Sequence, residues 1–114
     1  MISSEEKRKS VRIPVDLEAH FTVDKKEYPG RVLNLSIDGA FFKAQHLLDA
    51  DDTFEFTFHI PGGKHPVKAL ARVVWGGSIE GAAVRAFGMG IRFEDLGFEY
   101  QREIADYIDR LLKA

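Results

Sequence analysis

The sequence contains no cysteine and only one tryptophan among its 114 residues. The lack of cysteine excludes a disulfide-stabilised fold, a thiolate metal site and a cysteine nucleophile. Long apolar runs are missing too, so no segment is expected to insert into a membrane. The N-terminal residues, from Met1 to Lys7, have no apolar stretch like that of a signal peptide. We therefore expect a cytoplasmic protein.

Composition and charge are those of one ordinary globular domain, with 45% hydrophobic and 30% charged residues. The net charge of −2 argues against binding to a nucleic-acid polymer. The charge is unevenly distributed, however. Residues 1–12 carry four cations and two anions, whereas residues 94–114 carry six anions and three cations. If the short basic end binds an anion, we expect that anion to be small.

Alternating apolar and polar residues predict that most of the chain forms β-strands. The predicted strands are 15–23, 31–33, 40–42, 54–60, 66–75, 82–87 and 89–93. Around the last two, Gly88 and Gly90 indicate a bend or a close backbone approach. From Phe98 to Lys113 the apolar residues recur every three or four positions, which predicts an amphipathic helix. Six or seven antiparallel strands followed by a helix suggest a small β-barrel with the helix packed on it.

Residue patterns typical of enzymes are weak or missing. None of the four histidines has metal-ligand spacing with another, and there is no nucleophile elbow or phosphate-binding Walker loop. The acidic residues between Asp49 and Asp52 lack the spacing of a calcium loop and are expected to be solvated. We therefore expect a protein that is not an enzyme and holds no metal.

A basic motif precedes the first predicted strand. It consists of Arg8 and Arg12, four positions apart, with Lys7 just before them. If the segment turns, the two guanidinium groups can converge on one ligand, where they suit phosphate oxygens and guanine edges. Taken alone, the motif is more typical of a solvated basic tail.

A polar motif lies between two predicted strands and contains Asn34, Ser36 and Gly39. Its side chains can close a local turn, and Gly39 can adopt a positive φ or let a backbone come close. The same amide and hydroxyl can also bind a base edge or a phosphate. A β-turn alone would explain these residues, so only the combination of both motifs is informative.

Together, the two motifs resemble those of the PilZ domain family, which binds the bacterial second messenger cyclic di-GMP. Three other segments are also similar to the family: 13–16, 72–75 and 88–93. The resemblance implies an all-β fold, a six-stranded antiparallel PilZ-type β-barrel over residues 13–114 with a C-terminal α-helix at about 97–113. Residues 1–12 would form a flexible ligand-binding arm.

The resemblance also implies a cyclic di-GMP site. Arg8 and Arg12 would grip phosphates and guanine edges, and Asn34, Ser36 and Gly39 would complete the site on the barrel. No other cofactor is implied.

Two further positions, each next to a motif residue, bear on the stoichiometry and affinity of ligand binding. Lys7 stands just before the first arginine, where a cation in the family favours a stacked pair of ligands over a single one. Asp38 stands where glycine is frequent, and a carboxylate near a dianionic ligand is mildly unfavourable unless it points away.

The implied activity is that of a receptor and adaptor. Binding would order residues 1–12 over the barrel and change the surface shown to a partner, an unidentified downstream effector protein. We expect a monomer or weak dimer that regulates motility, pili, exopolysaccharide or a related bacterial behaviour. One alternative is a degenerate PilZ-like adaptor that binds protein but no nucleotide. Another is a small nucleic-acid-binding barrel, which the negative net charge and the few aromatic residues among the cations disfavour.

Overall fold

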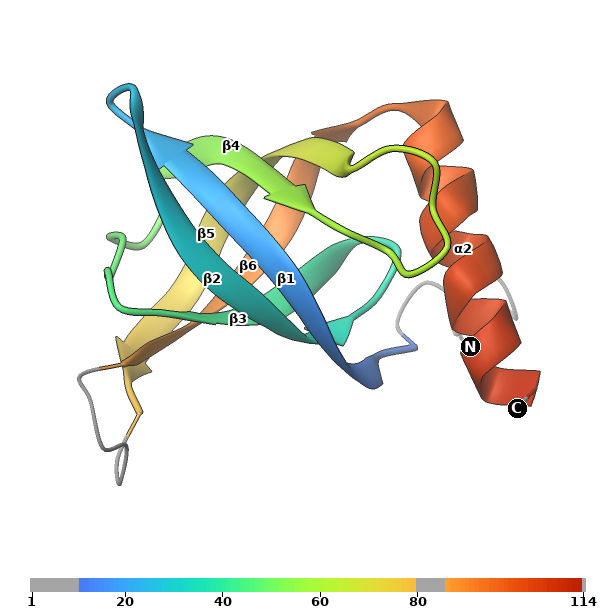
Figure 1. Ribbon diagram of the computed structural model, residues 1–114. Coiled ribbons are helices and arrows are strands. Elements are labelled where there is room, and N and C mark those ends of the chain that lie inside the picture. The colour runs from blue at the N-terminus through green and yellow to red at the C-terminus, as the bar shows by residue number, and fades with distance from the viewer. Residues whose placement is uncertain (1–10, 80–85, 114) are drawn as a thin grey trace, which may run out of the picture.

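The computed structural model describes residues 11–79 and 86–113. Its elements are β1 (Ile13–Val23), β2 (Lys26–Leu35), β3 (Gly39–Ala44), β4 (Thr53–Phe58), β5 (Val67–Ser78), β6 (Phe87–Leu96) and α2 (Phe98–Lys113). The strands close into an antiparallel barrel in the order β1-β2-β3-β6-β5-β4, and α2 lies beside one end of it (Figure 1). The predicted six-stranded barrel with a C-terminal helix is confirmed.

Phenylalanine rings fill the inside of the barrel. The alternate residues Phe54, Phe56 and Phe58 of β4 are all buried. The ring of Phe42 lies 5.0 Å from that of Phe56 and 5.4 Å from that of Phe21, measured between centroids. Burying one such side chain contributes about 1.5–3 kcal/mol, so this cluster is a main source of stability.

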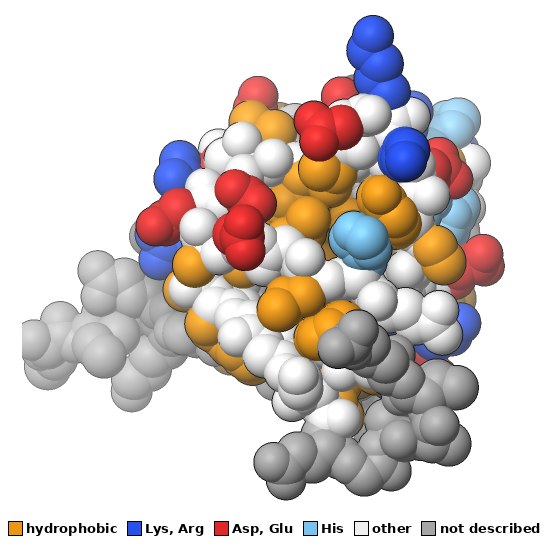
Figure 2. Space-filling model, turned by 90° about the vertical axis from the view of Figure 1, so that its left-hand side faces the viewer, with side chains coloured by type: hydrophobic (Ala, Val, Ile, Leu, Met, Phe, Trp, Pro, Cys, Tyr) orange, Lys and Arg blue, Asp and Glu red, His pale blue; other side chains and the backbone are white. Residues whose placement is uncertain are grey.

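The end of the barrel away from α2 is covered by side chains of β2 and of the β3–β4 connection. Tyr28 stacks on His46 with ring centroids 4.3 Å apart, and on the buried Phe21 at 5.4 Å. Figure 2 shows this face, where apolar side chains gather near the centre and charged side chains surround them. Since the interior is packed with side chains, a ligand has to bind on the outside of the barrel.

The predicted break between two strands at Gly88 is wrong, whereas most of the predicted strand 82–87 falls on residues that the structure does not describe. A single strand, β6, runs through both glycines, and residues 80–85 lie outside the described ranges. The predicted close approach is real, because a Cβ atom at Gly88 would overlap the ring of Phe41 and one at Gly90 the ring of Trp75. The glycines of β6 therefore make room for two aromatic rings rather than bend the strand.

Helix α2 has the predicted bounds but a narrower packed face than expected. Ile104 and Ile108 are buried with the barrel core. Phe98 and Leu111 follow the same spacing of three to four residues but are 72% and 40% exposed. The middle of the helix therefore attaches it to the barrel. Within residues 11–79 and 86–113, no helix is both long and apolar enough to cross a membrane.

Candidate ligand-binding site

Two β-bulges shape one outer face of the barrel. One interrupts the β2–β3 pairing between Val32 and Asn34, and the other interrupts the β5–β6 pairing between Val73 and Trp75. A bulge adds an unpaired residue and redirects the side chains beside it. As a result, the consecutive residues Val74 and Trp75 are both 55% exposed instead of alternating between core and solvent.

The exposed indole of Trp75 is held by a second ring. It stacks on Phe41 of β3, with centroids 5.4 Å apart and planes inclined by 20°. Gly88 and Gly90 on β6 provide the space in which these rings lie. The pair forms a flat aromatic surface, which is the kind of surface on which a purine base stacks.

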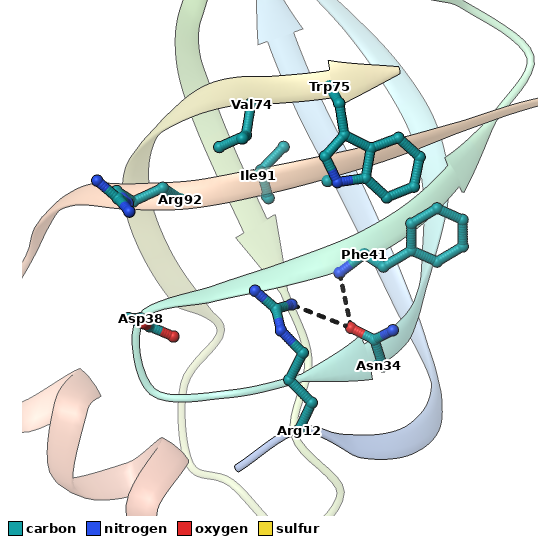
Figure 3. Close-up of a pocket in the computed structure, with 9 residues that line it drawn as sticks. Arg12, Asn34, Asp38, Phe41, Val74, Trp75, Ile91 and Arg92 are labelled. Atoms are coloured by element: carbon teal, nitrogen blue, oxygen red, sulfur yellow. Dashed lines mark hydrogen bonds between the residues drawn. The ribbon is translucent and has the colours of Figure 1, made fainter. Parts of the chain in front are cut away.

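A guanidinium group lies near this aromatic surface. Arg12 Nη1 donates a hydrogen bond of 3.4 Å to Asn34 Oδ1, and the same oxygen accepts one of 3.1 Å from the backbone N–H of Phe41 (Figure 3). Asn34 therefore links the charged side chain of Arg12 to β3, the strand that carries Phe41. Arg12 itself is exposed, so its remaining donors are available to a ligand.

These groups surround a pocket of about 510 Å³ between β2, β3, β5 and β6. Ligand pockets in proteins typically measure about 300–1,000 Å³, so the space suits a nucleotide-sized molecule. The pocket is lined by Arg12, Asn34, Asp38, Phe41, Val74, Trp75, Gly90, Ile91 and Arg92 (Figure 3). It combines arginine cations, an amide and an aromatic face, which together suit an anionic ligand with a flat base.

The structure brings two of the predicted site residues into this pocket, Arg12 and Asn34. Lys7 and Arg8, the other predicted cations, lie outside the described residues. Ser36 lies in the β2–β3 connection and Gly39 is the first residue of β3; neither lines the pocket.

Ser36 is completely buried and holds the connection together. Its backbone N–H donates to the Gly39 carbonyl at 2.9 Å. Its hydroxyl can donate either to Asp38 Oδ1 at 2.5 Å or to the Gly39 carbonyl at 3.2 Å. In this structure, the hydroxyl therefore fixes the turn that carries Asp38.

Gly39 is required by strand packing. The positive φ considered for it is not observed. Instead, a Cβ atom at this position would clash with the carbonyl oxygen of Ile91 and lie 3.4 Å from Arg92 Cα. Gly39 allows β3 and β6 to approach each other at Arg92, which lines the pocket.

Several pocket residues were not predicted from the sequence. Trp75, Phe41 and Arg92 all line the pocket, although the sequence only places them in predicted strands and gives them no part in a ligand site. The signal for the aromatic pair was present in Gly88 and Gly90, whose missing side chains leave room for rings. Which rings fill that room depends on strand register.

Comparisons with known proteins agree with this architecture. The sequence profile of the PilZ domain matches residues 6–110, so the chain belongs to the PilZ domain family. No curated protein gives a significant sequence match. No group of three or more histidine or acidic side chains within the described ranges is placed to hold a metal ion.

Solved structures with this fold share little sequence with the chain. The inhibitor of motility MotI/DgrA from Bacillus subtilis aligns with a TM-score of 0.78 at 16% identity, covering 99% of this chain and 57% of that one. The PilZ domain of YcgR from Escherichia coli, determined with c-di-GMP, gives 0.71 at 15% identity, covering 94% and 92%. PlzA from Borreliella burgdorferi, in complex with c-di-GMP, gives 0.64 at 9%, covering 94% and 53%. The chain thus spans about half the length of MotI and PlzA.

Proposed function

We propose that the chain is a receptor for cyclic di-GMP and that the ligand binds in the pocket of Arg12, Asn34 and Trp75. The observation that carries the proposal is the position of the Arg12 guanidinium, hydrogen-bonded to Asn34 at a pocket that also exposes Trp75. Cyclic di-GMP has two phosphates and two guanines. A guanidinium fork binds phosphate oxygens or the O6 and N7 atoms of guanine, and an indole stacks on the base. Membership of the PilZ family and the relatives determined with c-di-GMP support this assignment.

The basic N-terminal motif completes the proposed site. Arg8 and Lys7 precede Arg12 in sequence, and Arg12 reaches Asn34 on the barrel. We expect the bound ligand to draw residues 1–12 over the barrel face and so to change the surface of the protein around the pocket. Ser36 and Gly39 support this site indirectly: Ser36 fixes the turn that carries Asp38, and Gly39 allows the contact of β3 with β6 at Arg92.

The output of the receptor is proposed to be contact with another protein. The chain acts as an adaptor rather than an enzyme, and an effector protein reads the surface changed by the ligand. MotI, an inhibitor of motility, shares the fold, which supports motility among the candidate processes; pili and exopolysaccharide are the others. The proposed location is the cytoplasm, where such a receptor would encounter a nucleotide second messenger.

We expect isothermal titration of the full chain with cyclic di-GMP to give two ligands per chain. The physical reason is the cation of Lys7 beside the arginine motif, since a stacked pair of ligands carries four phosphate charges. A ratio of one ligand per chain would contradict the paired mode but leave the receptor function intact. A ligand at about 100 times its Kd should stabilise the folded protein by about 2.7 kcal/mol and so raise its melting temperature. No binding heat, together with an unchanged melting temperature, would therefore favour an adaptor that binds only protein.

A further inference from the structure

Asp38 brings a carboxylate to the pocket beside the cations that an anionic ligand needs. It is exposed and lines the pocket together with Arg12 and Arg92 (Figure 3). Neither arginine forms an ion pair within the part of the chain that the structure describes. Both cations are therefore available to a ligand, and Asp38 is the acidic side chain that shares their pocket.

The backbone and side chain of Asp38 are both held in place. Its carbonyl accepts a hydrogen bond of 2.9 Å from the backbone N–H of Phe93, which ties the turn to β6. Its Oδ1 lies 2.5 Å from the hydroxyl of the buried Ser36. Because Gly39 pairs with Arg92 across β3 and β6, the carboxylate is anchored next to the strand position of Arg92. It cannot swing away into solvent without losing the Ser36 contact.

We propose that Asp38 is an affinity-setting residue, whose fixed negative charge weakens the binding of cyclic di-GMP in this pocket. The inference rests on the proposed function. A carboxylate in the pocket competes with the ligand for the guanidinium groups and also repels the ligand's phosphates. Both effects weaken ligand binding. Since the pocket is open to solvent, the effect is moderate and screened by salt. Asp38 thus keeps the receptor from saturating at low ligand concentration.

The test is the isosteric variant Asp38→Asn in the full chain, titrated with cyclic di-GMP. Asparagine keeps an Oδ1 acceptor for the Ser36 hydroxyl but removes the charge. We expect the variant to bind about three- to tenfold more tightly, and the difference to shrink as salt is raised from about 50 mM to about 500 mM. The matched control is Asp95→Asn, an exposed acid of β6 that does not line the pocket, which should leave the affinity unchanged.

The possible outcomes separate the inference from the proposed function. Equal affinities of wild type and Asp38→Asn would overturn the inference alone. Weaker binding by the variant would also overturn it, because the carboxylate would then be accepting hydrogen bonds from the N–H groups of a guanine. Binding by the variant but not by the wild type would support the effect of the Asp38 charge but overturn the proposed receptor function of the wild type. No binding by either protein would overturn both the proposed function and the inference that rests on it.

Discussion

Replacing Arg12 by alanine is expected to lower the affinity for cyclic di-GMP at least a hundredfold. Arg12 is the guanidinium group placed at the pocket through Asn34. A hydrogen bond between a charged group and its partner contributes about 1.5–3 kcal/mol, and a fork makes two of them. Losing both corresponds to about 3–6 kcal/mol. Arg12→Lys should recover only part of this, since an ammonium keeps the charge but not the fork.

The matched control for Arg12→Ala is Arg31→Ala. Arg31 is another exposed arginine, but its partner is Asp16 and it does not line the pocket. The control removes the same charge and should bind as the wild type does. Both variants should keep nearly the wild-type melting temperature without ligand, because Arg31 loses only an exposed ion pair, worth about 0–1 kcal/mol, and Arg12 only an exposed hydrogen bond. Normal binding by Arg12→Ala, measured by titration calorimetry, would show that the ligand site has been misplaced.

Gly39→Ala is expected to destabilise the fold by about 3 kcal/mol. The added Cβ would meet the Ile91 carbonyl oxygen, with the Ile91 carbonyl carbon at 3.2 Å and Arg92 Cα at 3.4 Å. These are backbone atoms, so no side chain can move aside to relieve the overlap. The β3–β6 contact would have to open, and overpacking of this kind costs about 1–3 kcal/mol or more. Urea unfolding followed by circular dichroism measures the loss.

The chain offers a control for this variant in Gly77 of β5. A Cβ at Gly77 would meet no atom of the described residues within 4 Å, and the φ of Gly77 is not positive. We expect Gly77→Ala to change the free energy of unfolding by no more than about 0.5 kcal/mol. If Gly39→Ala unfolds at the same urea concentration as Gly77→Ala, the close contact with Ile91 is not a constraint on the fold.

The barrel could be predicted because most strands repeat a simple alternation. In β4 and the first part of β5, every second residue is apolar and buried, so the period of two identifies both the strand and its inner face. The helix was predicted for the same kind of reason, from its period of three to four. The strand break at Gly88 and Gly90 was predicted wrongly, because a glycine that makes room for a ring looks the same in sequence as one that bends a strand.

The site could be predicted only in part. Arg12 and Asn34 belong to short motifs that are visible in the sequence, and both line the pocket. Trp75 lies where the alternation of β5 points inward, and the bulge after Val73 turns it outward. A bulge depends on the pairing of two strands. Phe41 of β3 and Trp75 of β5 stack on each other because both strands pair with β6, which lies between them. Local sequence patterns contain neither kind of information.

The emission of Trp75 provides the most direct test of the proposed site. It is the only tryptophan in the sequence and is 55% exposed in the pocket, so its fluorescence reports on this site alone. We expect titration with cyclic di-GMP to quench the emission to saturation, as a guanine stacks on the indole, with the same Kd as calorimetry gives. Arg12→Ala should abolish the change and Arg31→Ala should preserve it. Binding heat without any change in Trp75 emission, or no binding at all, would contradict the assignment of this pocket as the cyclic di-GMP site.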